Sequence, residues 1–144
     1  DSVGGWAALA GAMLLGARDG KYSADGTVNA LPGCSLPMTT LGVFILWLGW
    51  FGFNGGSQLA LGSGADATAV ADIFVNTNLA AAGGVLACMI VSKATNSHTN
   101  IAATLNGAIA GLVAITAEPL TPSMGQAAII GAIGGIICMY GMKC

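Results

Sequence analysis

The stretch "LGVFILWLGWFGFNGGSQLAL", residues 41–61, decides the fold because it carries no charged side chain and is rich in large apolar residues. It lies within a longer run, residues 26–65, that contains no Asp, Glu, Lys or Arg. Further runs of this kind follow at residues 73–92, 94–117 and 119–142. A helix crosses the hydrocarbon core of a bilayer with roughly 20 apolar residues. Each run is therefore long enough to hold one membrane-spanning helix.

The composition of the whole chain supports the same interpretation. Hydrophobic residues make up 55% of the 144 residues and charged residues only 7%, whereas a soluble domain carries about a quarter charged residues. The formal net charge of −2 gives no electrostatic basis for binding nucleic acid. The composition thus predicts an integral membrane protein whose surroundings are the lipid bilayer.

We expect an all-α, polytopic transmembrane helix bundle of about five segments, at residues 2–17, 37–61, 68–92, 100–117 and 124–142. The connectors between them are rich in glycine, and Pro119 and Pro122 stop a helix before the last segment. The first segment is short for a full crossing. We interpret it as the end of a longer helix, which implies that the chain is a fragment.

Charged residues predict the orientation of this bundle. If the segments cross in turn, the basic residues all fall on one face, namely Arg18, Lys21, Lys93 and Lys143. Asp66 and Glu118 then fall on the other face. The positive-inside rule makes the basic face cytoplasmic. Residues 50–57 are therefore expected near the outer end of the second segment.

Small and polar residues inside the segments predict how the helices pack. Gly107 and Gly111, like Gly131 and Gly135, are four residues apart, a spacing that brings helix backbones close together in lipid. Polar groups in lipid seek partners on neighbouring helices, so the side chains of residues 76–78 are expected to form such hydrogen bonds.

Asp72 stands at the predicted outer end of the third segment. A carboxylate is favoured near a helix N-terminus. We therefore interpret Asp72 as a capping or mouth-lining residue.

Trp50, Phe53 and Ser57 have the spacing i, i+3 and i+7, which places them on one stripe of a helix. Packing between helices is the common use of an aromatic stripe and stays an alternative. Ser57, together with Asn54, is however expected to place a polar group beside the aromatic face. An aromatic face attracts a cation by roughly 0.5 to 2 kcal/mol, whereas a charge at the bilayer centre costs at least about 2.5 to 3.5 kcal/mol. The stripe suits recruitment of a small cation that sheds its charge before the apolar middle, as ammonium does by losing a proton.

Several stretches resemble consecutive signatures of the Amt/MEP/Rh ammonium transporter family and occur in the family's order: "SVGGWAALAGA", "LGVFILWLGWFGFNGGSQLAL", "FVNTNLAAAGG" and "LNGAIAGLVAIT". Together they cover nearly the whole chain, so residues 1–144 are interpreted as one partial ammonium transporter domain. The resemblance implies an eleven-helix fold built from inverted repeats, of which this chain contains the end of span five through span nine. It also implies a homotrimer in the plasma membrane, with one pore per subunit.

The same resemblance implies roles for individual residues. Phe53 corresponds to the family's pore-gating phenylalanine, Ser57 to the serine that helps bind ammonium at the outer mouth, and Trp50 to a tryptophan lining the pore region. Asp1 stands where the first of the family's paired pore histidines is expected, and the second is expected beyond Cys144. His98, the only histidine of the chain, matches neither position and is interpreted as a surface residue.

The implied function is transport of ammonium/ammonia, with ammonium recruited at the outer mouth and ammonia passing a hydrophobic pore. The alternative is an ammonium-sensing receptor domain of the same fold, coupled to a signalling module. The family also implies a PII-type regulatory protein as a partner on the cytoplasmic face. The chain offers no catalytic triad, phosphate loop or metal-ligand spacing of cysteines, so no enzymatic activity, cofactor or metal is predicted.

Overall fold

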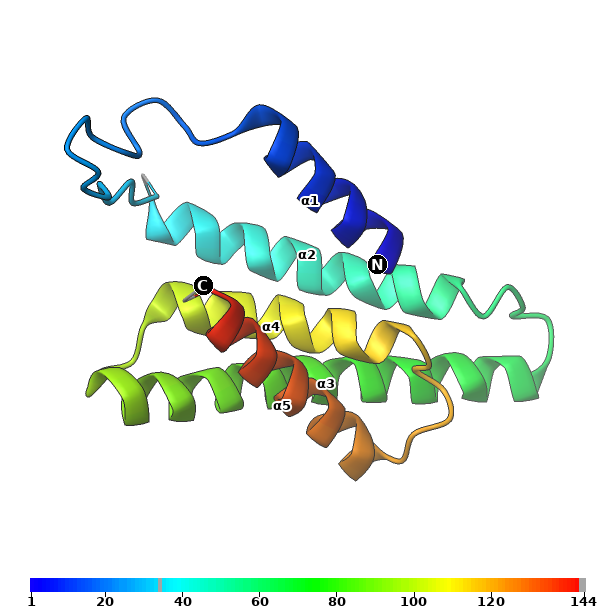
Figure 1. Ribbon diagram of the computed structural model, residues 1–144. Helices are drawn as coiled ribbons and strands as arrows, with labels where there is room; N and C mark the ends of the chain where they lie inside the picture. The colour runs from blue at the N-terminus through cyan, green and yellow to red at the C-terminus, as the bar shows by residue number, and fades with distance from the viewer. Residues whose placement is uncertain (34, 143–144) are drawn as a thin grey trace. The chain divides into compact units, whose positions relative to one another are not determined.

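The computed structural model describes residues 1–33 and 35–142, and these residues form an all-helical structure (Figure 1). Its helices are α1 (Ser2–Leu15), α2 (Leu36–Gly56), α3 (Gly64–Asn96), α4 (Ile101–Thr116) and α5 (Met124–Gly141). The chain divides into two compact units. The first unit holds α1 and the long connector that follows it, and the second holds α2 to α5.

In the first unit, the connector after α1 is ordered by local hydrogen bonds. Tyr22 and Val28 form an isolated antiparallel bridge. Between them, the Asp25 carboxylate accepts hydrogen bonds from the hydroxyl and from the amide of Thr27, the latter at 3.0 Å. These hydrogen bonds favour the charged form and hold the pKa of Asp25 below its ordinary value.

In the second unit, α2 to α5 run alternately in opposite directions (Figure 1). One end of this unit, which we call the outer end, therefore carries the last turn of α2, the first turn of α3, the last turn of α4 and the first turn of α5. Asp66 lies in the first turn of α3 and Glu118 follows α4, so both are at the outer end, whereas Lys93 lies in the last turn of α3 at the opposite end. The predicted alternation is confirmed for these residues; Lys143 lies outside the described residues.

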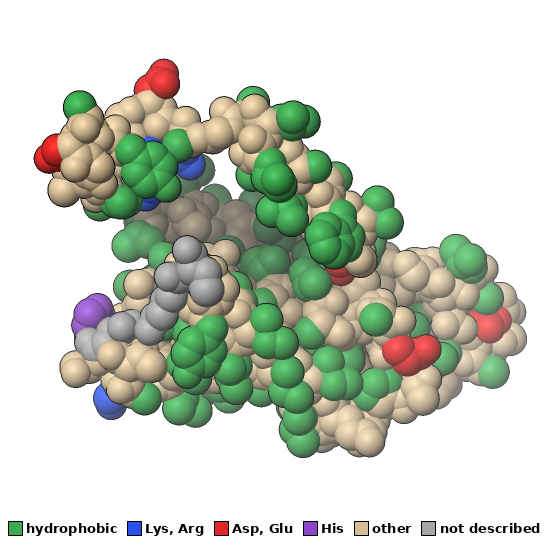
Figure 2. Space-filling model, viewed as in Figure 1, with side chains coloured by type: hydrophobic (Ala, Val, Ile, Leu, Met, Phe, Trp, Pro, Cys, Tyr) green, Lys and Arg blue, Asp and Glu red, His purple; other side chains and the backbone are tan. Residues whose placement is uncertain are grey.

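Among the helices of residues 1–33 and 35–142, three are long and apolar enough to cross a membrane, namely α2, α3 and α5. The helices α1 and α4 are apolar but shorter, and the 16 residues of α4 extend over about 24 Å. On the face of the molecule in view, charged side chains are few and hydrophobic side chains are spread over the helices (Figure 2). Such a surface suits contact with lipid or with further apolar helices.

Several helix ends differ from the predicted ones: α1 ends at Leu15 rather than at residue 17, α3 ends at Asn96 rather than at residue 92, and the largest other differences are the end of α2 and the start of α3. Helix α2 ends at Gly56 rather than at residue 61, because two consecutive glycines weaken the helix and Leu59 then adopts a positive φ of 59°. Helix α3 begins at Gly64 rather than at residue 68. A capping box starts it there: the Ser63 side chain accepts from the amide of Asp66, and the Asp66 carboxylate accepts from the amide of Ser63.

This start of α3 corrects the interpretation of Asp72 as a capping residue. Asp72 lies eight residues after Gly64, beyond the second turn, where the helix has no orphan amide to cap. Ser63 and Asp66 cap the helix instead, as the two members of the capping box. The role of Asp72 at the mouth stays a prediction.

The small residues pack the core of the second unit as predicted. Helix α3 contacts both neighbours through Ala80 and Gly84. Ala80 lies against Gly111 of α4 and Gly131 of α5. Gly84 lies against Gly107 of α4 and Gly135 of α5, so α4 is antiparallel to α3 and α5 is parallel to it. A Cβ atom on Gly135 would lie 2.6 Å from the carbonyl oxygen of Gly84, which is closer than atoms pack. The three backbones can approach this closely because the glycines at the contact lack side chains.

Candidate functional site

The predicted stripe lies at the outer end of α2, and its two aromatic rings are in contact. The rings of Trp50 and Phe53 meet edge to face, with centroids 5.7 Å apart and planes inclined at 65°, a favourable geometry for an aromatic pair. The Phe53 side chain is 53% exposed. A large part of its ring is therefore available to a ligand or to another segment of the protein.

A hydrogen bond fixes the orientation of Trp50. Its indole Nε1–H donates to Oγ1 of Thr116, the last residue of α4, at 2.8 Å. The Thr116 hydroxyl in turn donates to the backbone carbonyl of Leu112 at 2.7 Å. Because the hydroxyl proton is held by Leu112, its oxygen faces the indole as an acceptor. The edge of the Trp50 ring is thus tied to α4.

Ser57 lies directly beyond the end of α2 but still follows its helical path. Its amide and its hydroxyl both donate to the carbonyl oxygen of Phe53, at 3.3 Å and 2.6 Å respectively. A hydroxyl whose proton is engaged keeps lone pairs on its oxygen. Ser57 is exposed, so this oxygen is available to accept a hydrogen bond from an N–H group.

Asn54, between these residues, serves a different purpose from the one its sequence position suggests. It is 1% exposed, and its side-chain Nδ2 donates to Oγ1 of Thr77 on α3 at 3.0 Å. Asn54 therefore joins α2 to α3 and does not add a polar group beside the exposed Phe53 ring. The expected bonding of Thr77 to a neighbouring helix is confirmed.

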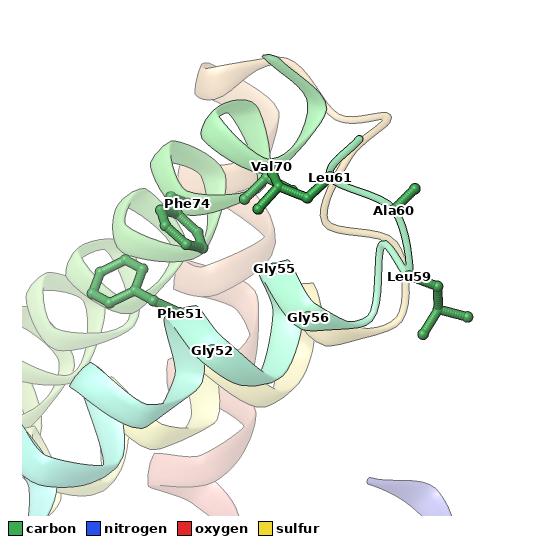
Figure 3. Close-up of a pocket in the computed structure, with 9 residues that line it drawn as sticks. All are labelled: Phe51, Gly52, Gly55, Gly56, Leu59, Ala60, Leu61, Val70 and Phe74. Carbon is green, nitrogen blue, oxygen red and sulfur yellow. The ribbon is translucent and has the colours of Figure 1, made fainter. Parts of the chain in front are cut away.

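The opposite side of α2 borders an apolar hollow of about 470 Å³ at the outer end (Figure 3). Its lining comes from α2, from the connector after it and from α3: Phe51, Gly52, Gly55, Gly56, Leu59, Ala60, Leu61, Val70 and Phe74. The Phe51 and Phe74 rings meet edge to face with centroids 5.5 Å apart. None of the three predicted site residues lines this hollow, so it is distinct from the stripe.

Two contacts at the outer end of α2 are not indicated by the sequence. Thr116 is 66 positions from Trp50, and no local pattern indicates that their side chains meet. Phe74 packs so closely on Gly55 that a Cβ atom there would overlap its ring. Within residues 1–33 and 35–142, no group of His, Cys, Asp and Glu is arranged to hold a metal ion.

Comparison with known proteins places this geometry in a family. The profile of the Ammonium Transporter Family matches residues 1–144. The chain is 46% identical over 140 residues to the ammonium transporter Amt2 of Archaeoglobus fulgidus, covering 97% of this chain and 29% of that protein. It is 42% identical over 144 residues to a putative ammonium transporter of Synechocystis sp., covering 99% of this chain and 32% of the relative.

A solved structure supports the same assignment. The chain superposes on a sensor Amt protein with a TM-score of 0.88 and 38% identity, over 97% of this chain and 33% of the other. The chain thus spans about a third of the length of these relatives. It has the all-helical fold of that structure and the apolar helices of a membrane protein, and it belongs to the ammonium transporter family.

Proposed function

We propose that the full-length protein transports ammonium across a membrane, recruiting the cation at its outer mouth and passing ammonia through a hydrophobic pore. The observation that carries this proposal is the arrangement of Trp50, Phe53 and Ser57. Two aromatic rings in edge-to-face contact lie next to an exposed hydroxyl oxygen at one end of α2. An aromatic face and a hydrogen-bond acceptor are together the partners that an ammonium ion requires.

Each partner acts on a different property of the ion. The exposed ring of Phe53 offers its π face to the positive charge, an attraction of about 0.5 to 1 kcal/mol at an exposed site. The Ser57 oxygen accepts one N–H of the ion, and the Phe53 carbonyl keeps that hydroxyl turned so that its lone pairs face outward. Trp50 contributes a ring whose position is held by Thr116.

The apolar surroundings decide what passes farther inward. The attraction at the mouth is smaller than the cost of a charge at the bilayer centre, which is at least about 2.5 kcal/mol. The ion must therefore lose a proton, and neutral ammonia continues. The chain spans about a third of the length of its relatives, and we expect further parts of the full-length protein to complete the pore.

The remaining expectations from the family resemblance stay predictions. We expect a homotrimer in the plasma membrane, with the Lys93 end of the bundle in the cytoplasm and the Ser57 end outside. A PII-type regulatory protein is the expected partner at the cytoplasmic end. The opposite positions of Lys93 and Asp66 on α3 support this orientation.

An ammonium sensor is the alternative use of the same fold. The name of the solved structure describes that protein as a sensor, whereas the relatives in Archaeoglobus fulgidus, Synechocystis sp. and Bacillus subtilis are named as transporters or putative transporters. We therefore keep transport as the proposal. The names also contain nothing that points to an enzyme.

Reconstitution of the full-length protein in proteoliposomes separates the two functions. A transporter moves labelled methylammonium into the vesicles faster than protein-free vesicles take it up. A sensor binds ammonium but leaves the uptake at the protein-free rate. Binding without uptake would therefore overturn the proposed function.

A further inference from the structure

We propose that a second, polar pocket at the outer end binds a small monovalent cation that donates hydrogen bonds, with ammonium as the fitting example. This pocket has a volume of about 310 Å³ and lies between α3 and the start of α5. Asp72 and Asn76 of α3 line one side of it, and Leu120, Pro122, Ser123 and Met124 line the other. It shares no lining residue with the Trp50 stripe or with the hollow in Figure 3.

The amide of Asn76 is the first observation that points to a ligand. Asn76 is 3% exposed, and its Nδ2 donates to the carbonyl oxygens of Pro119 and Pro122, at 3.0 Å and 2.8 Å. Because both partners are acceptors, the nitrogen must face them, and the oxygen Oδ1 must point the other way. The amide orientation is thus fixed by the connector between α4 and α5.

No group among residues 1–33 and 35–142 donates to this Oδ1 atom. The same described part of the chain contains no fully enclosed side-chain oxygen without a partner. Oδ1 therefore reaches accessible space, and the space that Asn76 borders is this pocket. A side chain buried to this degree rarely leaves an acceptor without a partner.

Asp72 supplies the charge. It lies one helical turn before Asn76, at the spacing i and i+4, so the two side chains share one face of α3. Within the described part of the chain, no side chain or backbone group donates to its carboxylate. Helix α3 is capped by Asp66, and α5 has its own capping box of Ser123 and Gln126. Neither helix start uses Asp72 as a cap.

The chemistry of the lining selects the class of ligand. A carboxylate and an amide oxygen are both acceptors, and no basic side chain lines the pocket. The carboxylate balances one positive charge. Ca²⁺ takes six to eight oxygen ligands, whereas the lining offers one carboxylate and one amide oxygen. The pocket therefore suits a monovalent cation with N–H donors.

The position of the pocket suggests what it does. Asp72 lies eight residues into α3, about 12 Å along its axis, at the same end of the bundle as Ser57. A cation held there raises the local ammonium concentration at the mouth. This role, although not the binding itself, rests on the proposed function.

Binding is tested on the full-length protein carrying Phe53→Ala and Ser57→Ala, which removes the proposed mouth site. Ammonium chloride is expected to raise the melting temperature of this protein, and potassium chloride at equal ionic strength is not. Adding Asp72→Asn abolishes the shift, whereas Asp72→Glu retains it. Glu118→Gln is the matched control, because Glu118 is an exposed carboxylate at the same end that does not line the pocket.

An equal shift with potassium, or an equal loss with Glu118→Gln, would overturn the assignment. In the otherwise unchanged protein, Asp72→Asn is expected to raise the KM for methylammonium about fivefold with kcat unchanged. If the unchanged protein shows no uptake, the proposed function fails, and the melting-temperature experiment still decides whether the pocket binds ammonium.

Discussion

The indole nitrogen of Trp50 and the hydroxyl oxygen of Thr116 are 2.8 Å apart, and this hydrogen bond joins α2 to α4 at the outer end. It connects the candidate site to the packed core, because Thr116 is the last residue of α4, and Leu112 and Ile115 of that helix are fully buried. The ring of Trp50 in turn supports the exposed ring of Phe53. The site is thus held from α4 as well as from α2.

Replacing Thr116 with valine tests this support. Valine keeps the shape of the side chain but removes the acceptor, which leaves the indole N–H without its partner. We expect a loss of stability of about 1 kcal/mol and a higher KM for methylammonium, because the aromatic pair is less well positioned. Both are measured on the purified, reconstituted protein.

Thr104→Val is the matched control for this experiment. Thr104 lies on the same helix, and its hydroxyl donates to the carbonyl of Asn100 in the preceding turn. The Thr104→Val variant removes a hydroxyl that makes no hydrogen bond to α2. An unchanged KM in Thr116→Val, or an equal change in Thr104→Val, would show that the Trp50 hydrogen bond does not position the site.

The buried pair of Asn54 and Thr77 predicts coupling between α2 and α3. Thr77→Val leaves the buried Nδ2 group of Asn54 without its acceptor, at a cost of about 1 to 3 kcal/mol. The double variant Asn54→Leu, Thr77→Val is expected to lose less unfolding free energy than the two single variants lose together. The reason is that the double variant leaves no buried amide without a partner. A double-mutant cycle on the unfolding free energy measures this, and simple additivity would argue against the hydrogen bond.

The glycines of α5 predict a sharp contrast between two positions. A Cβ atom on Gly131 would overlap the carbonyl of Ala80, whereas one on Gly125 meets no atom within 4 Å. Gly131→Ala is therefore expected to destabilise the protein by about 1 to 3 kcal/mol. Gly125→Ala should be neutral or slightly stabilising, because alanine favours a helix. Thermal unfolding in detergent compares them, and equal melting temperatures would contradict the packing described above.

The helices could be predicted from the sequence because charge-free runs of spanning length have few other uses. The ends of α2 and α3 were misplaced for identifiable reasons. The apolar residues 59–61 resemble the continuation of a span, although Gly55 and Gly56 end the helix. The sequence does mark the start of α3, because Ser63 and Asp66 have the spacing of a capping box. The pattern of apolar residues alone does not reveal this pair.

The contacts around the site depend on tertiary structure and could not be predicted. The stripe of Trp50, Phe53 and Ser57 followed from helical spacing and from the family resemblance. Its anchor Thr116 is far away in the sequence, and nothing local marks it. Asn54 was misread because its neighbours suggested a mouth, whereas its partner Thr77 lies on another helix.

The connector after α1 predicts a pH dependence. The two hydrogen bonds from Thr27 lower the pKa of Asp25 below its ordinary value of 3.8. Because the folded pKa is the lower one, the stability from these bonds is fully present above pH 3.8 and is lost as the pH falls through the folded value. Titration of the Asp25 carboxyl carbon by NMR checks this, with Asp25→Asn to assign the signal. A midpoint at or above 3.8 would contradict the hydrogen bonding of this turn.

The uptake of labelled methylammonium by proteoliposomes containing the full-length double variant Phe53→Ala, Ser57→Ala decides whether the outer end of α2 recruits ammonium. Phe44→Ala is the matched control, because Phe44 is an exposed phenylalanine on the same helix, 60% exposed against 53% for Phe53. We expect the double variant to have a much higher KM for methylammonium, whereas Phe44→Ala transports like the unchanged protein. Unchanged uptake by the double variant would show that neither residue belongs to the site and that ammonium is not recruited at the outer end of α2.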